Sequence, residues 1–262
     1  EKARKPLVVS VGNRDGSWRW IPASLRGQQA VILTEGFPRV TVPDSGPATD
    51  ARRFQVEVAM GQGGAATLQV AEQHSGLAGA TWRQTFRRVP EAELDRLMRE
   101  NYVGRVFPGA QVTSFEIANA AQREEPLQMS FTAEVPRFGR PTGSGVLVPN
   151  VFAVNLAQEL AQRASRETTM GVGGRALEVV TRIEGVAAPE RTVARLPTVA
   201  LEGFGGSRYS REARVEGGVI VITRKLVVPE TNVPASEYEA FARFCRAVTE
   251  AEMVEIPVRP AN

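Results

Sequence analysis

The chain alternates between apolar and polar residues over long stretches, which is the pattern of strands with one buried face. Phe54, Val56 and Val58 lie at every second position, and Leu68 and Val70 continue the alternation after a Gly-rich turn. Successive side chains of a strand point to opposite faces, so this spacing predicts an antiparallel hairpin. Similar runs predict further strands at 112–118, 127–135, 177–183, 192–201, 208–215, 219–224 and 254–258.

The first forty residues carry a related pattern. An apolar run at 7–11 is followed by a turn sequence at 13–16, and then by Trp18 and Trp20 at strand spacing. Apolar residues at every second position on either side of a turn predict another hairpin. Pro, Gly and Ser dominate residues 43–49, a composition typical of a linker.

Other segments change to the spacing of an amphipathic helix. Leu94, Leu97 and Met98 fall at positions i, i+3 and i+4, within a helical region predicted over 77–103. A short helix is expected at 156–163, and a longer one is expected to begin after Pro234 and end near Glu250. Helices are therefore few compared with strands.

These elements predict an α+β fold that is predominantly antiparallel β, with two sandwich-like β domains that each carry one or two helices. A segment rich in Pro and Gly at 136–149 is the expected boundary between them. The first β-rich domain, with its helical insert, is then 50–149, and the second, with a C-terminal helix and strand, is 150–262. Residues 1–45 form the hairpin that precedes both.

Composition excludes several kinds of site. One Cys and one His rule out an internal disulfide and any centre that needs two imidazoles or a Cys cluster, so neither a metal nor a cofactor is expected. The 32 basic and 29 acidic residues are interleaved and give a net charge of +3, which predicts no nucleic-acid partner. No run approaches the roughly 18 apolar residues of a membrane span, so none is expected.

Cys245 and His74 are the candidate thiol nucleophile and imidazole base. Cys245 falls on the apolar stripe of its predicted helix, close to that helix's C-terminal end, which favours a buried and inert thiol. His74 ends a strand just before a turn, which favours a solvated side chain. The alternative is that the two residues complete the active site of a thiol peptidase or amidase.

The densest group of basic and aromatic residues lies at 82–88. Arg83, Arg87 and Arg88 surround Trp82 and Phe86, and this group is a candidate docking patch for an acidic protein partner. The competing interpretation is that Trp82 and Phe86, at i and i+4, form the buried face of a helix whose arginines face solvent.

The order of these features resembles the C-terminal accessory region of bacterial proteins that carry a transglutaminase-like domain. Residues 16–25, with Trp18 and Trp20, are similar to the closing strand of the transglutaminase-like core. Residues 54–148 are similar to the β-domain that follows it, and 207–258 to the terminal module, with its Pro-x-x-x-Tyr-x-x-Phe helix. The likeness spans most of the chain.

The resemblance implies that the catalytic Cys and His of such proteins lie upstream of residue 1. The Asp usual in the Trp-x-Asp-Pro stretch is missing here, where Trp20 is followed by Ile21 and Pro22. The expected function is therefore a non-catalytic accessory or protein-interaction module of a transglutaminase-like bacterial protein, either a fragment of it or a degenerate homologue, rather than an enzyme. Its expected partner is another protein or the upstream domains of the same parent, and the expected location is extracytoplasmic, in the periplasm of a Gram-negative-type bacterium.

Overall fold

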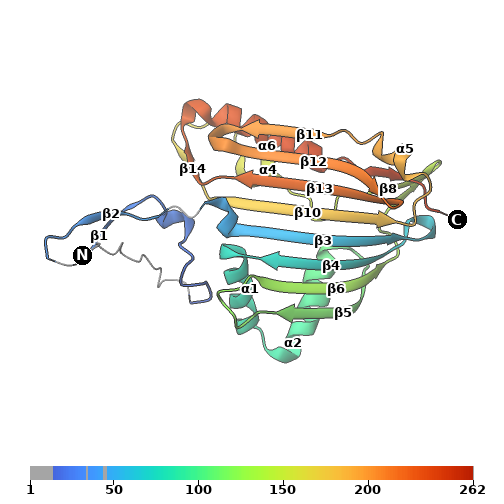
Figure 1. The fold of residues 1–262 in the computed structure, drawn as a ribbon, viewed down its shortest axis with the longest axis horizontal. Coiled ribbons are helices and arrows are strands. Elements are labelled where there is room, and N and C mark those ends of the chain that lie inside the picture. The colour runs from blue at the N-terminus through green and yellow to red at the C-terminus, as the bar shows by residue number, and fades with distance from the viewer. Residues whose placement is uncertain (1–13, 34, 44–45, 262) are drawn as a thin grey trace.

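A computed structural model describes residues 14–33, 35–43 and 46–261. It is an α+β protein dominated by antiparallel pairing, as expected, and its largest element is an eight-stranded sheet (Figure 1). The strands of this sheet, in spatial order, are β11 (Val199–Gly203), β12 (Ser207–Glu216), β13 (Val219–Val228), β10 (Arg175–Glu184), β3 (Ala51–Met60), β4 (Ala66–His74), β6 (Leu127–Val135) and β5 (Gln111–Ala118).

Smaller sheets and helices complete the described part of the chain. The small sheets pair β1 (Gln29–Val31) with β2 (Arg39–Thr41), β14 (Thr231–Val233) with β9 (Met170–Val172), and β8 (Gly145–Val148) with both β15 (Ile256–Val258) and β7 (Arg140–Thr142). The α-helices are α1 (Gly76–Arg88), α2 (Glu91–Arg96), α3 (Gly104–Val106), α4 (Leu156–Leu160), α5 (Pro189–Val193) and α6 (Tyr238–Glu252). A π-helical segment, η4 (Leu97–Val103), joins α2 to α3.

The two expected β domains are joined in one sheet. Strands β3 and β10 lie side by side as its parallel pair, with Ala51 opposite Ala176 and Ala59 opposite Glu184. The expected boundary at 136–149 holds β7 and β8 instead, and Val148 of β8 pairs with Ile256 near the end of the chain. The sequence pattern of a strand does not show which distant strand it pairs with. The Pro- and Gly-rich composition of 136–149 therefore suggested a domain boundary that the strand pairing does not follow.

One face of the large sheet is buried and the other is polar. In β3, Phe54, Val56 and Val58 are buried, whereas Gln55 and Glu57 on the opposite face are exposed. Figure 1 shows α1 and α2 beside the strands from β4 to β5, and α4 and α6 beside those from β11 to β13. The expected alternation is therefore present, with its apolar side under the helices.

Ion pairs cross the strands on the polar face. Glu178 of β10 lies 3.8 Å from Arg53 of β3 and 3.1 Å from Lys225 of β13. These side chains are about one-third to one-half exposed, so each pair contributes little to stability.

Several local predictions are wrong in detail. Trp18 and Trp20 lie in turns instead of a strand, and residues 1–13 of the predicted hairpin lie outside the described residues. The strand predicted at 192–201 is replaced by the end of α5 and the start of β11. Across the described ranges, no helix combines the length and the hydropathy needed to cross a membrane.

Candidate functional site

A cavity of about 1180 Å³ lies on the buried face of the large sheet, over the starts of the parallel strands β3 and β10. Its base is formed by Arg52 and Phe54 of β3 and by Leu177 of β10. Helix α1, the segment from η4 to α3, the loop 149–154 and the N-terminal segment form its walls. The wall residues include Trp20, Pro22, Leu77, Ala78, Thr81, Trp82, Tyr102, Val106, Phe107, Val151, Phe152, Val154 and Glu159.

Arg52 carries a guanidinium that is not paired within the described chain. The two-residue alternation of β3 places it on the same face as Phe54, at the base of the cavity. It makes no hydrogen bond or ion pair to any described residue. Burial lowers the pKa of Arg52 below its ordinary value, while the charge of Glu159 raises it and that of Arg175 lowers it. Arg52 is partly buried, and a partly buried cation without a direct contact to a carboxylate favours the arrival of an anion.

Glu72, His74 and Tyr102 form a buried polar cluster next to Arg52. The Nε2 atom of His74 lies 2.8 Å from Oε2 of Glu72, and the Tyr102 hydroxyl donates to the same oxygen over 2.6 Å. Glu72 is 1% exposed and His74 2%. Burial first, and then the charge of Glu72, raises the pKa of the Tyr102 phenol, so the hydroxyl stays protonated and remains a donor.

His74 is buried, contrary to the expectation of a solvated strand end. The chain turns into α1 directly after Ser75, and this helix covers the ring. The His74 ring lies edge-on to the Phe54 ring, with 5.7 Å between the ring centroids, and its centroid lies 6.3 Å from that of Trp82. It lines the cavity, and its Nδ1 atom has no hydrogen-bond partner in the described chain.

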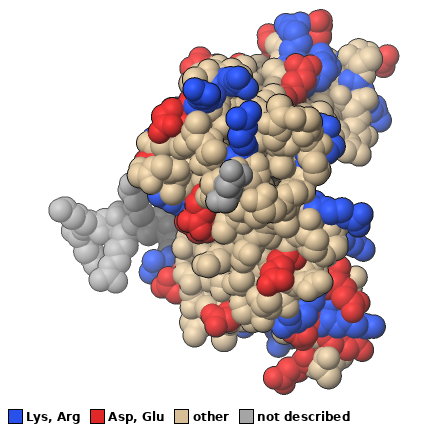
Figure 2. All heavy atoms as spheres, turned by 90° about the vertical axis from the view of Figure 1, so that its right-hand side faces the viewer, with Lys and Arg blue, Asp and Glu red and all other residues tan. Residues whose placement is uncertain are grey.

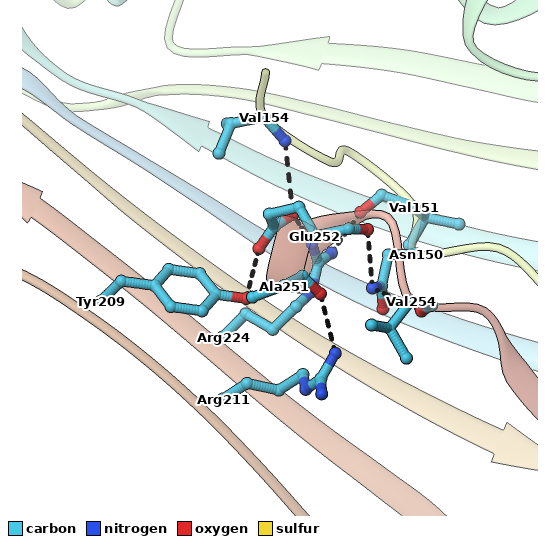
Figure 3. Close-up of polar contacts among 9 residues, drawn as sticks. All are labelled: Asn150, Val151, Val154, Tyr209, Arg211, Arg224, Ala251, Glu252 and Val254. Atoms are coloured by element: carbon cyan, nitrogen blue, oxygen red, sulfur yellow. Dashed lines mark hydrogen bonds and ion pairs between the residues drawn. The ribbon is translucent and has the colours of Figure 1, made fainter. Parts of the chain in front are cut away.

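A buried ion pair fixes the loop 149–154 that forms one wall (Figure 3). Arg224 of β13 contacts Glu252 of α6, and both side chains are 2% exposed. Arg224 also donates to the carbonyl oxygen of Val151, while the backbone N–H of Val154 donates to Oε2 of Glu252 over 3.3 Å. Tyr209 donates to the other Glu252 oxygen over 2.7 Å. The loop is thus held by side chains of β13 and α6.

This loop brings Phe152 over the base of the cavity. Phe152 has a φ of 52°, in the left-handed region that a bulky residue rarely adopts. Its ring stacks on Phe54 at 4.1 Å. The amide of Asn150 supports the same loop by donating to the carbonyl oxygens of Glu252 and Val254, over 2.9 and 3.1 Å.

Asp50 fastens the N-terminal segment to the cavity. Its carboxylate accepts from the Trp20 indole over 2.9 Å, from the Arg26 guanidinium over 2.5 Å and from the backbone N–H of Leu77 over 2.8 Å. Trp20 is 8% exposed as a result and lines the cavity. The opposite rim carries an ion pair of 2.6 Å between Arg175 and Glu159.

The expected docking patch at 82–88 is divided between different environments. Trp82 lines the cavity and stacks on Phe86 at 5.5 Å. Arg83, expected to face solvent, is 7% exposed and donates to the carbonyl oxygens of Asn119, Gln122 and Glu125. Arg87 pairs with Asp15 at 2.6 Å, and Arg88 is exposed. Only Arg87 and Arg88 of this group face solvent, because Arg83 holds the loop before β6.

The structure places Cys245 in the core of the other half, away from the lining of the cavity. The residue is fully buried on α6, as expected, and burial raises the pKa of its thiol to about 12. His74 has Glu72 as its partner. The two residues are therefore not brought together as a nucleophile and a base.

The fold and the cavity define a β-rich α+β protein with an internal site of mixed apolar and charged character. Comparison with protein-family models, with curated proteins and with solved structures gives no match. In the described ranges, no group of three or more His, Cys, Asp or Glu residues is arranged to hold a metal ion.

Sequence reasoning did not identify Arg52, Glu72 or Tyr102 as site residues. A signal for the first two was present in the alternation. Arg52 is in phase with Phe54 and the valines after it, and Glu72 is in phase with Leu68 and Val70. A charged residue on the apolar phase of a strand indicates a buried charge that needs a partner or a ligand.

Proposed function

We propose that this chain is a non-enzymatic binding module whose central cavity holds a small molecule with a large apolar part. The observation that carries this proposal is the character of the lining, which is mostly aromatic and aliphatic and includes a few convergent polar groups. Concave sites of this composition are typical of ligand binding. The cavity volume of about 1180 Å³ is ample for such a molecule.

The chemistry of the cavity supports binding over catalysis. A thiol peptidase needs a thiolate beside its base, whereas Cys245 has a pKa raised to about 12 and lies elsewhere. The hydroxyl of Thr81 in the cavity wall is not arranged as a nucleophile, because it donates its proton to the carbonyl oxygen of Leu77. If the thiol alternative were correct, Cys245→Ala would abolish an amidase or peptidase activity of the purified protein.

The proposal is tested by titrating the protein with Nile red, a neutral apolar dye that fluoresces when it leaves water. Ala78→Trp places a large side chain in the cavity wall, whereas the matched variant Ala71→Trp places it on the exposed face of β4. We expect the dye to bind the parent protein and Ala71→Trp equally, and Ala78→Trp at least about ten-fold more weakly. An absence of dye binding, or equal binding by all three proteins, would overturn the proposal.

A second role, in protein interaction, is favoured by the ribbon of β1 and β2. This ribbon extends from the main body in Figure 1 and exposes Val31, Leu33 and Phe37 by 53%, 87% and 67%. Exposed apolar side chains gathered in one place favour contact with another protein surface. We propose that the ribbon docks on a transglutaminase-like domain, the partner that the sequence resemblance implies. The extracytoplasmic location stays a prediction from the same resemblance.

The docking proposal is tested by calorimetric titration of a separately produced transglutaminase-like domain with the chain. Leu33→Ser combined with Phe37→Ser is expected to abolish binding, and Arg39→Ser in the same ribbon is the control. Binding that survives the double substitution would contradict this role.

The distribution of charge does not favour nucleic acid as a partner. Figure 2 shows acidic and basic side chains interspersed over the face it draws, with a largely uncharged middle. Binding to a polyanion depends on clustered positive charge and weakens steeply with salt. Weak retention on a heparin column at low salt is the result that this prediction requires.

A further inference from the structure

We propose that the ligand of the cavity is an amphipathic monocarboxylate of the fatty-acid class, with its carboxylate at Arg52 and His74 and its apolar tail against the aromatic lining. This inference rests on the proposed binding function and adds the chemical class of the ligand. Among the described residues, the cavity lining includes a guanidinium and an imidazole nitrogen without a hydrogen-bond partner, together with a mostly apolar wall, and each of these matches one part of such a molecule.

Arg52 and His74 are direct neighbours across two strands. The antiparallel register of β3 and β4 places them opposite each other on the buried face. Side chains at such positions start about 4.5–5.5 Å apart, and both residues line the cavity. The planar fork of the Arg52 guanidinium can donate to both oxygens of a carboxylate, and Nδ1 of His74 adds a second donor when the ring carries both protons.

The other cations that line or adjoin the cavity already have carboxylate partners. Arg175 is paired with Glu159 at 2.6 Å, and Arg26 with Asp50 at 2.5 Å. Arg52 alone among these three guanidiniums lacks such a contact in the described chain. The carboxylates of Glu159 and Glu72 already act on Arg52, so a ligand with several anionic groups would meet like charges, which favours a monocarboxylate.

His74 supplies the independent observation. The residue is 2% exposed, it lines the cavity, and its Nδ1 atom has no partner in the described chain. A buried polar atom without a hydrogen bond is costly, and such atoms are rare in folded proteins. Glu72 holds the opposite ring nitrogen, so the ring orientation is fixed with Nδ1 available to a ligand.

The apolar part of the ligand has its own surface. Phe54 and Phe152 stack at 4.1 Å at the base, and Trp82 lies edge-on to Tyr102 at 4.9 Å in the wall. Leu177 and Val106 complete a lining suited to a hydrocarbon chain. Burial of each CH₂ group of such a chain is favourable, and this gain does not depend on the charged head.

The test compares decanoate, decanol and decylamine, which share a ten-carbon chain and differ in the head group. Each is titrated into the protein by calorimetry at pH 7, and each is also used to displace Nile red. We expect decanoate to bind at least about ten-fold more tightly than decanol, because a charge-assisted hydrogen bond favours the anion. Decylamine is expected to bind most weakly.

Variants of two adjacent arginines identify the head-group site. Arg52→Gln is expected to make decanoate and decanol bind equally, whereas Arg53→Gln, on the solvent face of the same strand, is expected to retain the preference. Arg52→Lys keeps the positive charge but lacks the planar guanidinium, so it is expected to retain part of the preference for decanoate over decanol. Thermal unfolding of each variant verifies that it is folded.

The outcomes separate the two proposals. Equal affinity for decanoate and decanol in the parent protein, or a preference that survives Arg52→Gln, would overturn the carboxylate assignment and leave the binding function intact. If neither Nile red nor any decyl compound binds, both proposals are wrong.

Discussion

At the scale of single residues, buried charges set this protein apart from a simple half-buried sheet. Arg224 and Glu252 are each 2% exposed and hold each other and the loop 149–154. A buried ion pair is costly to break from one side because the remaining charge stays in a medium of low polarity. A weaker form of this reasoning applies to the partly buried Arg52, which has no carboxylate contact in the described chain and is the basis for the ligand proposed above.

Glu252→Gln is expected to lower the free energy of unfolding by about 3–5 kcal/mol, because Arg224 then keeps its charge without a counter-ion. The matched control is Glu255→Gln, which removes an exposed partner of Arg140 and is expected to cost less than about 1 kcal/mol. Urea unfolding curves of the two variants measure the difference. Similar losses in both would contradict the role assigned to the pair.

At the scale of elements, the turn from β4 into α1 organises the cavity. It buries His74, begins the helix that carries Trp82, and lies against Asp50, which also holds Trp20. Gly76 makes this turn possible with a φ of +57°. A Cβ atom there would lie 2.2 Å from Oδ1 of Asp50 and 2.3 Å from the carbonyl oxygen of Thr49.

Gly76→Ala is therefore expected to destabilise the protein by more than about 3 kcal/mol, through backbone strain and a steric clash. Gly217 is the matched control, since its φ is also +57° but a Cβ atom there would meet nothing within 4 Å. Gly217→Ala is expected to cost about 1 kcal/mol, from strain alone. Thermal unfolding compares the two, and equal losses would show that the contact with Asp50 does not matter.

Elements whose pattern depends on nearby residues were predictable from the sequence, whereas those fixed by distant contacts were not. The alternation in β3, β4 and β6 and the stripe of α6 were predictable because each depends on residues a few positions apart. The positions of Trp18 and Trp20 were not, because the Trp20 indole bonds to Asp50, thirty residues later. The predictions of a solvated His74 and a solvated Arg83 were wrong because other elements cover both: α1 lies against His74, and the segment 119–125 accepts hydrogen bonds from Arg83.

At the scale of the whole molecule, the parallel pairing of β3 with β10 makes one sheet from two segments that each resemble a domain. Each half would otherwise expose a long strand edge and the apolar residues beside it. The loop 149–154, held by Arg224 and Glu252, further links the halves around the cavity. The two halves are therefore expected to unfold together.

The chain is expected to unfold in urea as a single transition by two probes. Tryptophan fluorescence reports on the first half, which contains all 3 Trp residues. The reaction of Cys245 with a thiol reagent reports on the second half, because the folded state buries the thiol and raises its pKa to about 12. Coincident midpoints are expected, and Leu68→Ala in β4 is expected to lower the free energy of unfolding by about 2–5 kcal/mol and to shift both midpoints together. Separate midpoints would instead support two independent domains.

The sequence by itself determined the β-rich α+β class, the strands with one buried face, the buried thiol on α6 and the shortage of residues for metal or disulfide chemistry. These depend on composition and on spacing within one element, which the chain displays directly. Only the tertiary structure decided which strands pair across the centre, that Arg52 and His74 face each other, and that a cavity lies above them. The central strand pairing joins residues more than a hundred positions apart, such as Ala51 and Ala176, and no local pattern records such contacts.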